Sequence, residues 1–226
     1  MTDASAGTAR AALVSFAGLD GAGKTTQARL LADWLTATGF AVALEAPQGP
    51  SLLRSVLTNL ASDRGLLDHH EVFGPDVTYL LTAFMRYRDW TERVVPALRT
   101  HQWMVTDRSA VCYYAAAYAA GASNEETLRM VMRRLPVPDL ILFLDVTPEE
   151  AFRRLEQRND GREEATFLAA NERGYRQLPE FAGFTVIAGS GSIPEVHARV
   201  RRAVSQRFPD LLAATSRDQT VRPSPH

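Results

Sequence analysis

The sequence predicts an α/β fold: a doubly wound, five-stranded parallel sheet with a glycine-rich loop after its first strand and a helical lid. Short apolar runs alternate with longer stretches of helical periodicity, which is the pattern of strand–helix–strand units. The chain has 226 residues, 46% of them hydrophobic, which is enough for one sizeable core. We therefore predict a single domain over residues 11–212, with a flexible N-terminus at 1–10 and a flexible tail at 213–226.

The first half of the chain supplies two predicted strands, at residues 13–16 and 40–44. Helical periodicity predicts helices over the stretches 24–38, 51–60 and 76–100. Gly39 is placed to end the first helix. The segment 61–75 contains two glycines and a proline and is predicted to be a polar connection, and the long helix is expected to be interrupted or bent near Pro96.

Three further apolar runs predict the remaining strands, at 103–106, 140–144 and 184–187. The run LILFL at 140–144 is entirely apolar, which favours a buried central strand. An alanine- and tyrosine-rich helix precedes it and ends near Gly121. Two capping-box spacings, Thr147 to Glu150 and Ser192 to Glu195, predict where later helices begin. In such doubly wound sheets, ligands bind at the carboxyl ends of the strands.

Composition excludes several classes of protein. The formal net charge is −1, so no overall field favours nucleic acid or an anionic membrane. The single cysteine, Cys112, rules out an internal disulfide framework and fits a reducing compartment. No apolar run approaches the roughly 18 residues of a membrane span, and the first ten residues lack a signal-peptide core. We expect a cytoplasmic protein with no nucleic-acid or membrane partner.

The strongest motif is GLDGAGKT at residues 18–25, which matches G-x-x-x-x-G-K-[ST] in full and lies between a strand and a helix. Its glycines let backbone N–H groups turn inward around phosphate oxygens, at the positive end of the following helix. Lys24 can reach the β- and γ-phosphates, and the Thr25 hydroxyl can bind Mg²⁺. The motif predicts a P-loop that binds ATP and Mg²⁺ through these residues: Gly18, Asp20, Gly21, Ala22, Gly23, Lys24, Thr25 and Thr26.

A P-loop site needs a second acidic group at the end of a neighbouring strand to hold or orient the metal. Two residues qualify, Asp107 after the run WMVT and Asp145 after LILFL. The pattern alone leaves both open. We favour Asp107 as the metal residue because an arginine stands beside it and no helix cap competes for it.

Four segments, in order, resemble thymidylate kinases and together cover most of residues 13–204. FAGLDGAGKTTQARLLADWL is similar to the phosphate-loop segment of that family, and VVPALRTHQWMVTDR to its approach to an Asp-Arg pair. PDLILFLDVTPEEAFRRLEQR resembles the fourth strand and the entry to a mobile lid. VIAGSGSIPEVHARV resembles the last strand and the loop beside the adenine.

The resemblance implies a role for each matching residue. Lys24 would stabilise the transferring phosphoryl group, and Asp20 would contact the 3′-hydroxyl of the acceptor sugar. Asp107 would organise Mg²⁺ and the acceptor, Arg108 would hold the acceptor phosphate, and Arg86 would lie against the base. The implied reaction is transfer of the γ-phosphoryl group of ATP to dTMP, giving dTDP, or to a related pyrimidine or modified nucleotide.

The resemblance also implies an arginine-bearing lid, at about residues 153–165. Arg154 would help to bind ATP there, while Arg158 and Arg162 would meet the phosphates during transfer. The phosphate loop has Ala22 where some members of the family carry an arginine, so the lid would have to supply the positive charge. Arg158 and Arg162 are four residues apart and would project from one face if that stretch is helical.

The sequence departs from the family in the acceptor pocket. The segment after the second strand reads Glu45-Ala46-Pro47, without the usual arginine, which Arg54 could replace. Ser109 stands where Tyr or His usually follows the Asp-Arg pair. The residues expected to line this altered pocket, besides Asp20, Arg86 and Arg108, are Pro47, Arg54, Thr82, Tyr113 and Tyr114.

Two other functions remain open on sequence grounds. A deoxynucleoside kinase shares the fold, and Asp107-Arg108-Ser109 is somewhat similar to its acidic-Arg-Ser motif; there a carboxylate must deprotonate a 5′-hydroxyl. A nucleotide-binding switch is the remote alternative, although the Asn-Lys-x-Asp base motif of GTPases is missing from the sequence. The resemblance also suggests a homodimer, through long helices that such kinases often pair.

Overall fold

A single parallel sheet runs in the order β2-β3-β1-β4-β5 and confirms the predicted α/β architecture. The computed structural model describes residues 10–46, 52–63, 65–66, 69–158 and 164–218. Its strands are β1 (Ala12–Ala17), β2 (Val42–Glu45), β3 (Trp103–Thr106), β4 (Leu140–Asp145) and β5 (Thr185–Ala188). All five lie within two residues of the predicted runs, because each run is apolar and bounded by turn residues.

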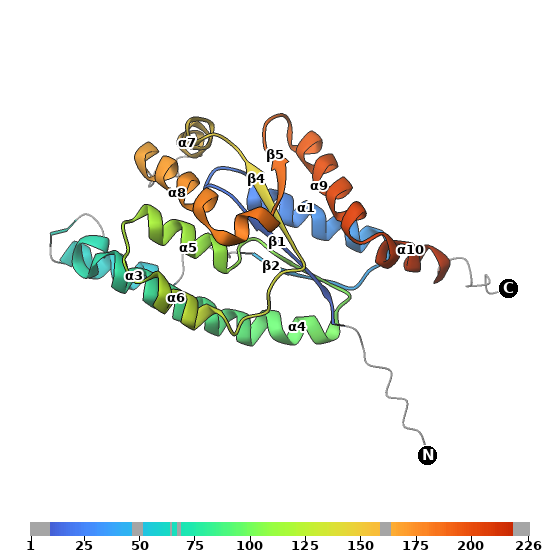
Figure 1. The fold of residues 1–226 in the computed structure, drawn as a ribbon, viewed down its shortest axis with the longest axis horizontal. Coiled ribbons are helices and arrows are strands. Elements are labelled where there is room, and N and C mark those ends of the chain that lie inside the picture. Colours follow the sequence, from blue (N-terminus) through green and yellow to red (C-terminus); the bar gives the residue numbers. More distant parts are fainter. Residues whose placement is uncertain (1–9, 47–51, 64, 67–68, 159–163, 219–226) are drawn as a thin grey trace, which may run out of the picture.

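Helices cover both sides of the sheet (Figure 1). On one side lie α1 (Lys24–Ala37) and α9 (Ile193–Arg207), and on the other lie α5 (Ala110–Ala119) and α8 (Ala165–Gln177). A nearly continuous rod along one margin is made of α3 (His69–Asp89), the π-helical turn η1 (Trp90–Val94) and α4 (Val95–Thr100). The remaining elements are α2 (Leu52–Asp63), α6 (Glu125–Met132), α7 (Pro148–Gln157), η2 (Pro179–Gly183) and α10 (Pro209–Asp218).

The strand register brings the functional segments to one edge of the sheet. Glu45 pairs with Thr106 and Thr106 with Ser15, so β1, β2 and β3 end at nearly the same level. The phosphate loop therefore emerges beside Asp107, which follows β3 directly. Side-chain burial on both faces of β1 and β3 explains why these strands are continuous apolar runs.

One prediction about the connections is wrong and one is confirmed. The segment 61–75 is not a long polar loop, because α2 continues to Asp63 and α3 already begins at His69. Gly74 adopts φ 69° and ψ 166° inside α3, so the Gly74-Pro75 pair produces a kink between helical segments rather than a loop. The predicted interruption near Pro96 is confirmed, since the π-helical turn η1 ends at Val94, two residues before the proline.

The last helix continues past residue 212, the predicted end of the domain. The helix α10 runs from Pro209 to Asp218 and therefore crosses that boundary. Leu211 and Leu212 pack against the core, and this apolar contact stabilises a helix that the polar composition of the last residues did not predict. Among the described helices, none is long and apolar enough to cross a membrane.

Candidate active site

The backbone of the phosphate loop turns through three glycines with positive φ: Gly18 at 131°, Gly21 at 85° and Gly23 at 96°. Two of them also allow a close approach to neighbouring backbone. A Cβ on Gly18 would lie 2.7 Å from the carbonyl oxygen of Leu144, and one on Gly21 would lie 2.4 Å from that of Ala151. The loop is therefore fixed against β4 and α7, with the N-terminus of α1 directly behind it.

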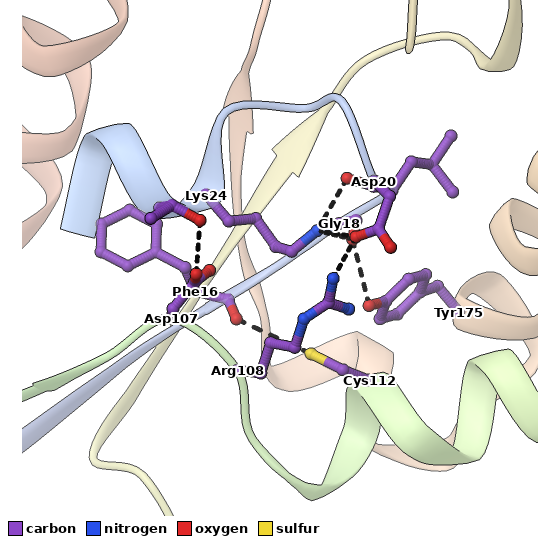
Figure 2. A network of polar contacts seen from close by, with 10 residues as sticks. Phe16, Gly18, Asp20, Lys24, Asp107, Arg108, Cys112 and Tyr175 are labelled. Atoms are coloured by element: carbon purple, nitrogen blue, oxygen red, sulfur yellow. Dashed lines mark hydrogen bonds and ion pairs between the residues drawn. The ribbon is translucent and has the colours of Figure 1, made fainter. Parts of the chain in front are cut away.

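The ammonium group of Lys24 lies back along the first residues of the loop (Figure 2). It donates hydrogen bonds to the carbonyl oxygens of Gly18 (2.9 Å) and Leu19 (2.8 Å) and to Oδ1 of Asp20 (2.9 Å). An ammonium group has three donors, so these three contacts use all of them. Lys24 must release at least one of these partners before it can donate to a phosphate oxygen.

Asp20 also accepts a charge-assisted hydrogen bond from Arg108, the first residue after Asp107 (Figure 2). Burial, the largest single influence, lowers the pKa of Arg108, but the Asp20 carboxylate and smaller contributions from neighbouring groups together more than offset this and the pKa lies well above its ordinary value. Arg108 is thus a fixed positive charge. The structure brings together three residues that the sequence placed in the active site: Asp20, Lys24 and Arg108.

Asp107 is buried and accepts a 2.5 Å hydrogen bond on Oδ2 from the hydroxyl of Thr25. Its other carboxylate oxygen, Oδ1, is buried with no hydrogen-bond partner among the described residues. A hydroxyl and an unpaired carboxylate oxygen in contact are ligands that suit Mg²⁺. Asp145, the other candidate, is instead paired with Arg176 at 2.8 Å, so the geometry favours Asp107 as the predicted metal residue.

On the acceptor side, Arg86 of α3 reaches towards the end of β2. Its guanidinium group lies 3.6 Å from Glu45 and 3.7 Å from Asp89, and 5.6 Å from the centre of the Tyr113 ring. Burial raises the pKa of Glu45, while Arg86 opposes that shift. Burial also raises the pKa of Tyr113 to about 12, so its hydroxyl stays protonated. Arg86, Glu45 and Tyr113 therefore lie beside one another, and the role of Arg86 and Tyr113 in a base pocket stays a prediction.

Other predicted pocket residues lie elsewhere or outside the described part of the structure. The ring of Tyr114 faces α6, with Arg129 4.4 Å from its centre, so only one of the two adjacent tyrosines faces Arg86. The difference follows from the 100° between successive helical residues. Thr82 donates its hydroxyl to Thr78 in its own helix. Two residues predicted to line this pocket cannot be placed, because Pro47 and the side chain of Arg54 lie outside the described part of the structure.

The lid arginines are only partly described. Arg154 of α7 donates to Glu150 (2.7 Å) and to the carbonyl oxygen of Gly189 (3.2 Å), which attaches α7 to the loop after β5. The helix ends at Gln157, and Arg158 is the exposed residue that caps it. The condition for Arg158 and Arg162 to share a helical face is therefore not met by α7, and Arg162 lies outside the described residues.

The sequence analysis did not identify Arg199 of α9 as a site residue. Its guanidinium group donates to the carbonyl oxygens of Ala188 (2.8 Å) and Ser190 (2.7 Å), in the same loop that Arg154 contacts. Three successive carbonyls of this loop are thus held by two arginines. Arg199 follows the capping-box Glu195 by four residues, and that spacing was the available sequence signal.

Comparison with known proteins identifies the family of the chain. The family model described as thymidylate kinase matches residues 16–200. A thymidylate kinase of Caldanaerobacter subterraneus subsp. tengcongensis is 29% identical over 207 residues, covering 87% of this chain and 96% of the relative. One from Synechococcus sp. (strain WH7803) is 32% identical over 211 residues, covering 83% and 92%. With the phosphate loop and the Asp-Arg pair joined in one site, the chain belongs to the thymidylate kinase family.

Proposed function

We propose that the protein transfers the γ-phosphoryl group of ATP to dTMP, giving dTDP, with Mg²⁺ as the metal. The observation that carries the proposal is the meeting of Lys24, Asp20 and Arg108 beside Asp107, at the carboxyl edge of the sheet. This arrangement supports the proposal because a phosphate loop, a carboxylate suited to a metal and an arginine suited to an anion lie close together there.

On the donor side, the P-loop amides and Lys24 would bind the triphosphate, and the lid arginines Arg154, Arg158 and Arg162 would approach it. Thr25 and Asp107 are the residues that fit Mg²⁺, since Oδ1 of Asp107 is buried and unpaired. When bound, Mg²⁺ neutralises charge on the phosphates. Gly21, Ala22, Gly23 and Thr26 would contribute backbone or first-turn contacts.

On the acceptor side, Arg108 would bind the phosphate of the nucleotide. Arg108 now pairs with Asp20, so an incoming phosphate would compete with that carboxylate for the arginine, and Asp20, which also accepts from Lys24, could then accept from the 3′-hydroxyl of the sugar. A phosphate acceptor is ionised near neutral pH, so no general base is required, and positioning with charge neutralisation carries the reaction. Arg86 and Tyr113 would line the base pocket, next to Glu45.

The test is a coupled ADP-release assay with ATP·Mg²⁺ and a panel of acceptors: dTMP, dUMP, dCMP, UMP, CMP, purine monophosphates and unphosphorylated nucleosides. We expect dTMP to give the highest kcat/KM. If a different monophosphate gives the highest kcat/KM, the proposed reaction stands but its preferred acceptor is not dTMP. The altered residues Ser109 and Thr82 would then account for the changed specificity. Reaction with nucleosides alone would contradict the role of Arg108 and support a deoxynucleoside kinase.

We also infer a cytoplasmic location and a homodimer. The one cysteine, Cys112, is a free and buried thiol, which fits a reducing compartment.

Exposed apolar side chains gather on α2 and α3, where Val56, Val77 and Phe84 are 45%, 45% and 55% exposed. A second copy would cover them by helix–helix packing. Light scattering after size exclusion checks this: Phe84→Glu should yield monomers where the parent protein gives dimers.

A further inference from the structure

The carbonyl oxygen of Gly18 accepts two hydrogen bonds, one from within the phosphate loop and one from a distant helix (Figure 2). Lys24 donates from within the loop at 2.9 Å, and the hydroxyl of Tyr175 donates from α8 at 3.2 Å. Tyr175 comes from the helix that follows the lid segment, far along the chain from the loop. Lys24 and Tyr175 therefore share one acceptor, although α8, which carries Tyr175, has no assigned role in the reaction.

The position of Tyr175 is built into the packing of α8. The preceding residue, Gly174, lies so close to α5 that a Cβ there would be 2.6 Å from the carbonyl oxygen of Ala115. This close approach brings Tyr175 beneath the loop, where it is fully buried and packs edge-on against Phe143 at 5.2 Å. Burial raises the pKa of Tyr175 well above its ordinary value, so the hydroxyl remains a hydrogen-bond donor.

Binding of ATP is expected to weaken or break the hydrogen bond from Lys24 to the Gly18 carbonyl. All three donors of Lys24 are occupied by Gly18, Leu19 and Asp20, so reaching a phosphate oxygen requires it to leave loop acceptors. Gly18 is buried, and a buried carbonyl left without a donor is costly. With Tyr175 in place, the Gly18 carbonyl keeps a partner after Lys24 has moved.

We propose that Tyr175 is a positioning residue that keeps the Gly18 carbonyl paired and so frees Lys24 to bind the phosphates of ATP. Tyr175 itself touches neither substrate. The inference rests on the proposed donor site and adds to it a contact between α8 and the phosphate loop. It predicts that the hydroxyl of Tyr175 matters for ATP binding only when Lys24 is present.

The experiment is a double-mutant cycle on ATP·Mg²⁺ binding, measured by calorimetry without any acceptor. The four proteins are the parent, Tyr175→Phe, Lys24→Met and the double variant. Tyr175→Phe keeps the buried ring, and Lys24 still pairs with Gly18 in the unliganded protein, so we expect it to fold with a nearly unchanged Tm. It should weaken ATP binding about tenfold, the size expected when a buried acceptor is left unpaired.

In the Lys24→Met background, the same Tyr175→Phe change should alter ATP affinity by less than about twofold. There the Gly18 carbonyl has the same partners with and without ATP, so the hydroxyl no longer affects binding. The matched control is Tyr118→Phe on α5, where the ring is 43% exposed. That variant should bind ATP like the parent.

Three outcomes would overturn the inference. Equal weakening in both backgrounds would mean that Tyr175 only shapes the loop. No weakening in the parent background would mean that its hydroxyl has no part in binding. Failure of the parent protein to bind ATP would refute the proposed donor site itself, and this inference with it, whereas the first two outcomes leave the donor site standing.

Discussion

The donor half and the acceptor half of the active site satisfy their polar groups in different ways. On the donor side, Lys24 has a partner for each of its three donors, and Arg199 and Arg154 hold the carbonyls of the loop after β5. On the acceptor side, Oγ of Ser109 and the hydroxyl of Tyr113 are buried with no hydrogen-bond partner among the described residues. The same holds for Oδ1 of Asp107, which lies where the two halves meet.

Ser109 shows the difference most clearly. It occupies the N-cap of α5, where a serine hydroxyl usually binds a backbone N–H of the first turn, yet it makes no such bond. An unpaired buried polar atom lowers the stability of the fold unless a ligand completes it. The contrast teaches that Lys24 in the donor half already has protein partners and must exchange one of them for ATP, while Ser109 and Tyr113 in the acceptor half still lack partners that a ligand could supply.

The largest effect is expected where the two halves meet. Asp107→Asn keeps the size of the side chain and a partner for Thr25 but removes the negative charge that would hold Mg²⁺. We expect kcat to fall about 10²- to 10³-fold and the Mg²⁺ concentration for half-maximal rate to rise. Steady-state rates over a Mg²⁺ titration measure both.

A matched control for that change is Asp139→Asn. Asp139 accepts from the backbone N–H of Leu13 at the opposite end of the sheet, so kcat should stay within about twofold. If Asp107→Asn behaves like this control while Asp145→Asn abolishes activity, the metal residue is Asp145 and the unpaired Oδ1 of Asp107 has another purpose.

The second effect should be confined to the acceptor. Arg108→Met removes the charge proposed to bind the acceptor phosphate, and we expect the KM for dTMP to rise about 10- to 100-fold. The KM for ATP should change less than about threefold. Arg88→Met on α3, whose side chain is 55% exposed, is the control and should leave both constants unchanged. A rise in the KM for ATP alone would place Arg108 in the donor half.

A smaller effect, on the KM for ATP and not on that for dTMP, is expected from Arg199→Met. The substitution removes two charge-assisted hydrogen bonds to the loop after β5, so the KM for ATP should rise about three- to tenfold while that for dTMP does not. Arg202→Met, on an exposed position of the same helix, is the comparison variant. Equal kinetics in the two variants would show that the loop holds its shape without Arg199.

The smallest expected effect is on stability and concerns Glu45. Its folded-state pKa is raised, so the protonated form favours folding at pH values below the unfolded value of about 4.5, and this stability is lost as pH rises through the folded pKa. Glu45→Gln keeps a neutral side chain at all pH values. We expect its Tm to exceed that of the parent by about 1–3 °C at pH 8, with the difference vanishing towards pH 4.5.

Thermal unfolding followed by circular dichroism at several pH values measures this difference. A lower Tm for Glu45→Gln at pH 8 would mean that the attraction between Glu45 and Arg86 outweighs the cost of burial. In that case the polar groups of the acceptor half would be better paired than the unpaired atoms around Asp107 indicate. The two halves would then differ less in how their polar groups are paired.

Much of the donor half could be predicted from the sequence because its signals are local. The phosphate loop is eight consecutive residues, and its glycines, Lys24 and Thr25 have roles fixed by that spacing. The five strands followed from apolar runs for the same reason. Asp107 was favoured over Asp145 from its immediate neighbours, and the geometry agrees, although its role as a metal ligand stays a prediction.

The acceptor half was less predictable because its contacts join distant segments. Tyr113 and Tyr114 are adjacent and chemically identical, and only the rotation of α5 against α3 and α6 decided that one meets Arg86 and the other Arg129. Gly74 signalled a break in the chain, but whether that break became a loop or a kink depended on packing.

The sequence by itself therefore determined the fold class, the phosphate loop and the candidate residues at the strand ends, since periodicity and turn chemistry act over a few residues. Only the tertiary structure decided which of these candidates touch. Thr25 meets Asp107 across 82 positions of sequence, and Tyr175 meets Gly18 across 157. Such contacts arise from strand register and helix packing, which bring together residues that no local pattern connects.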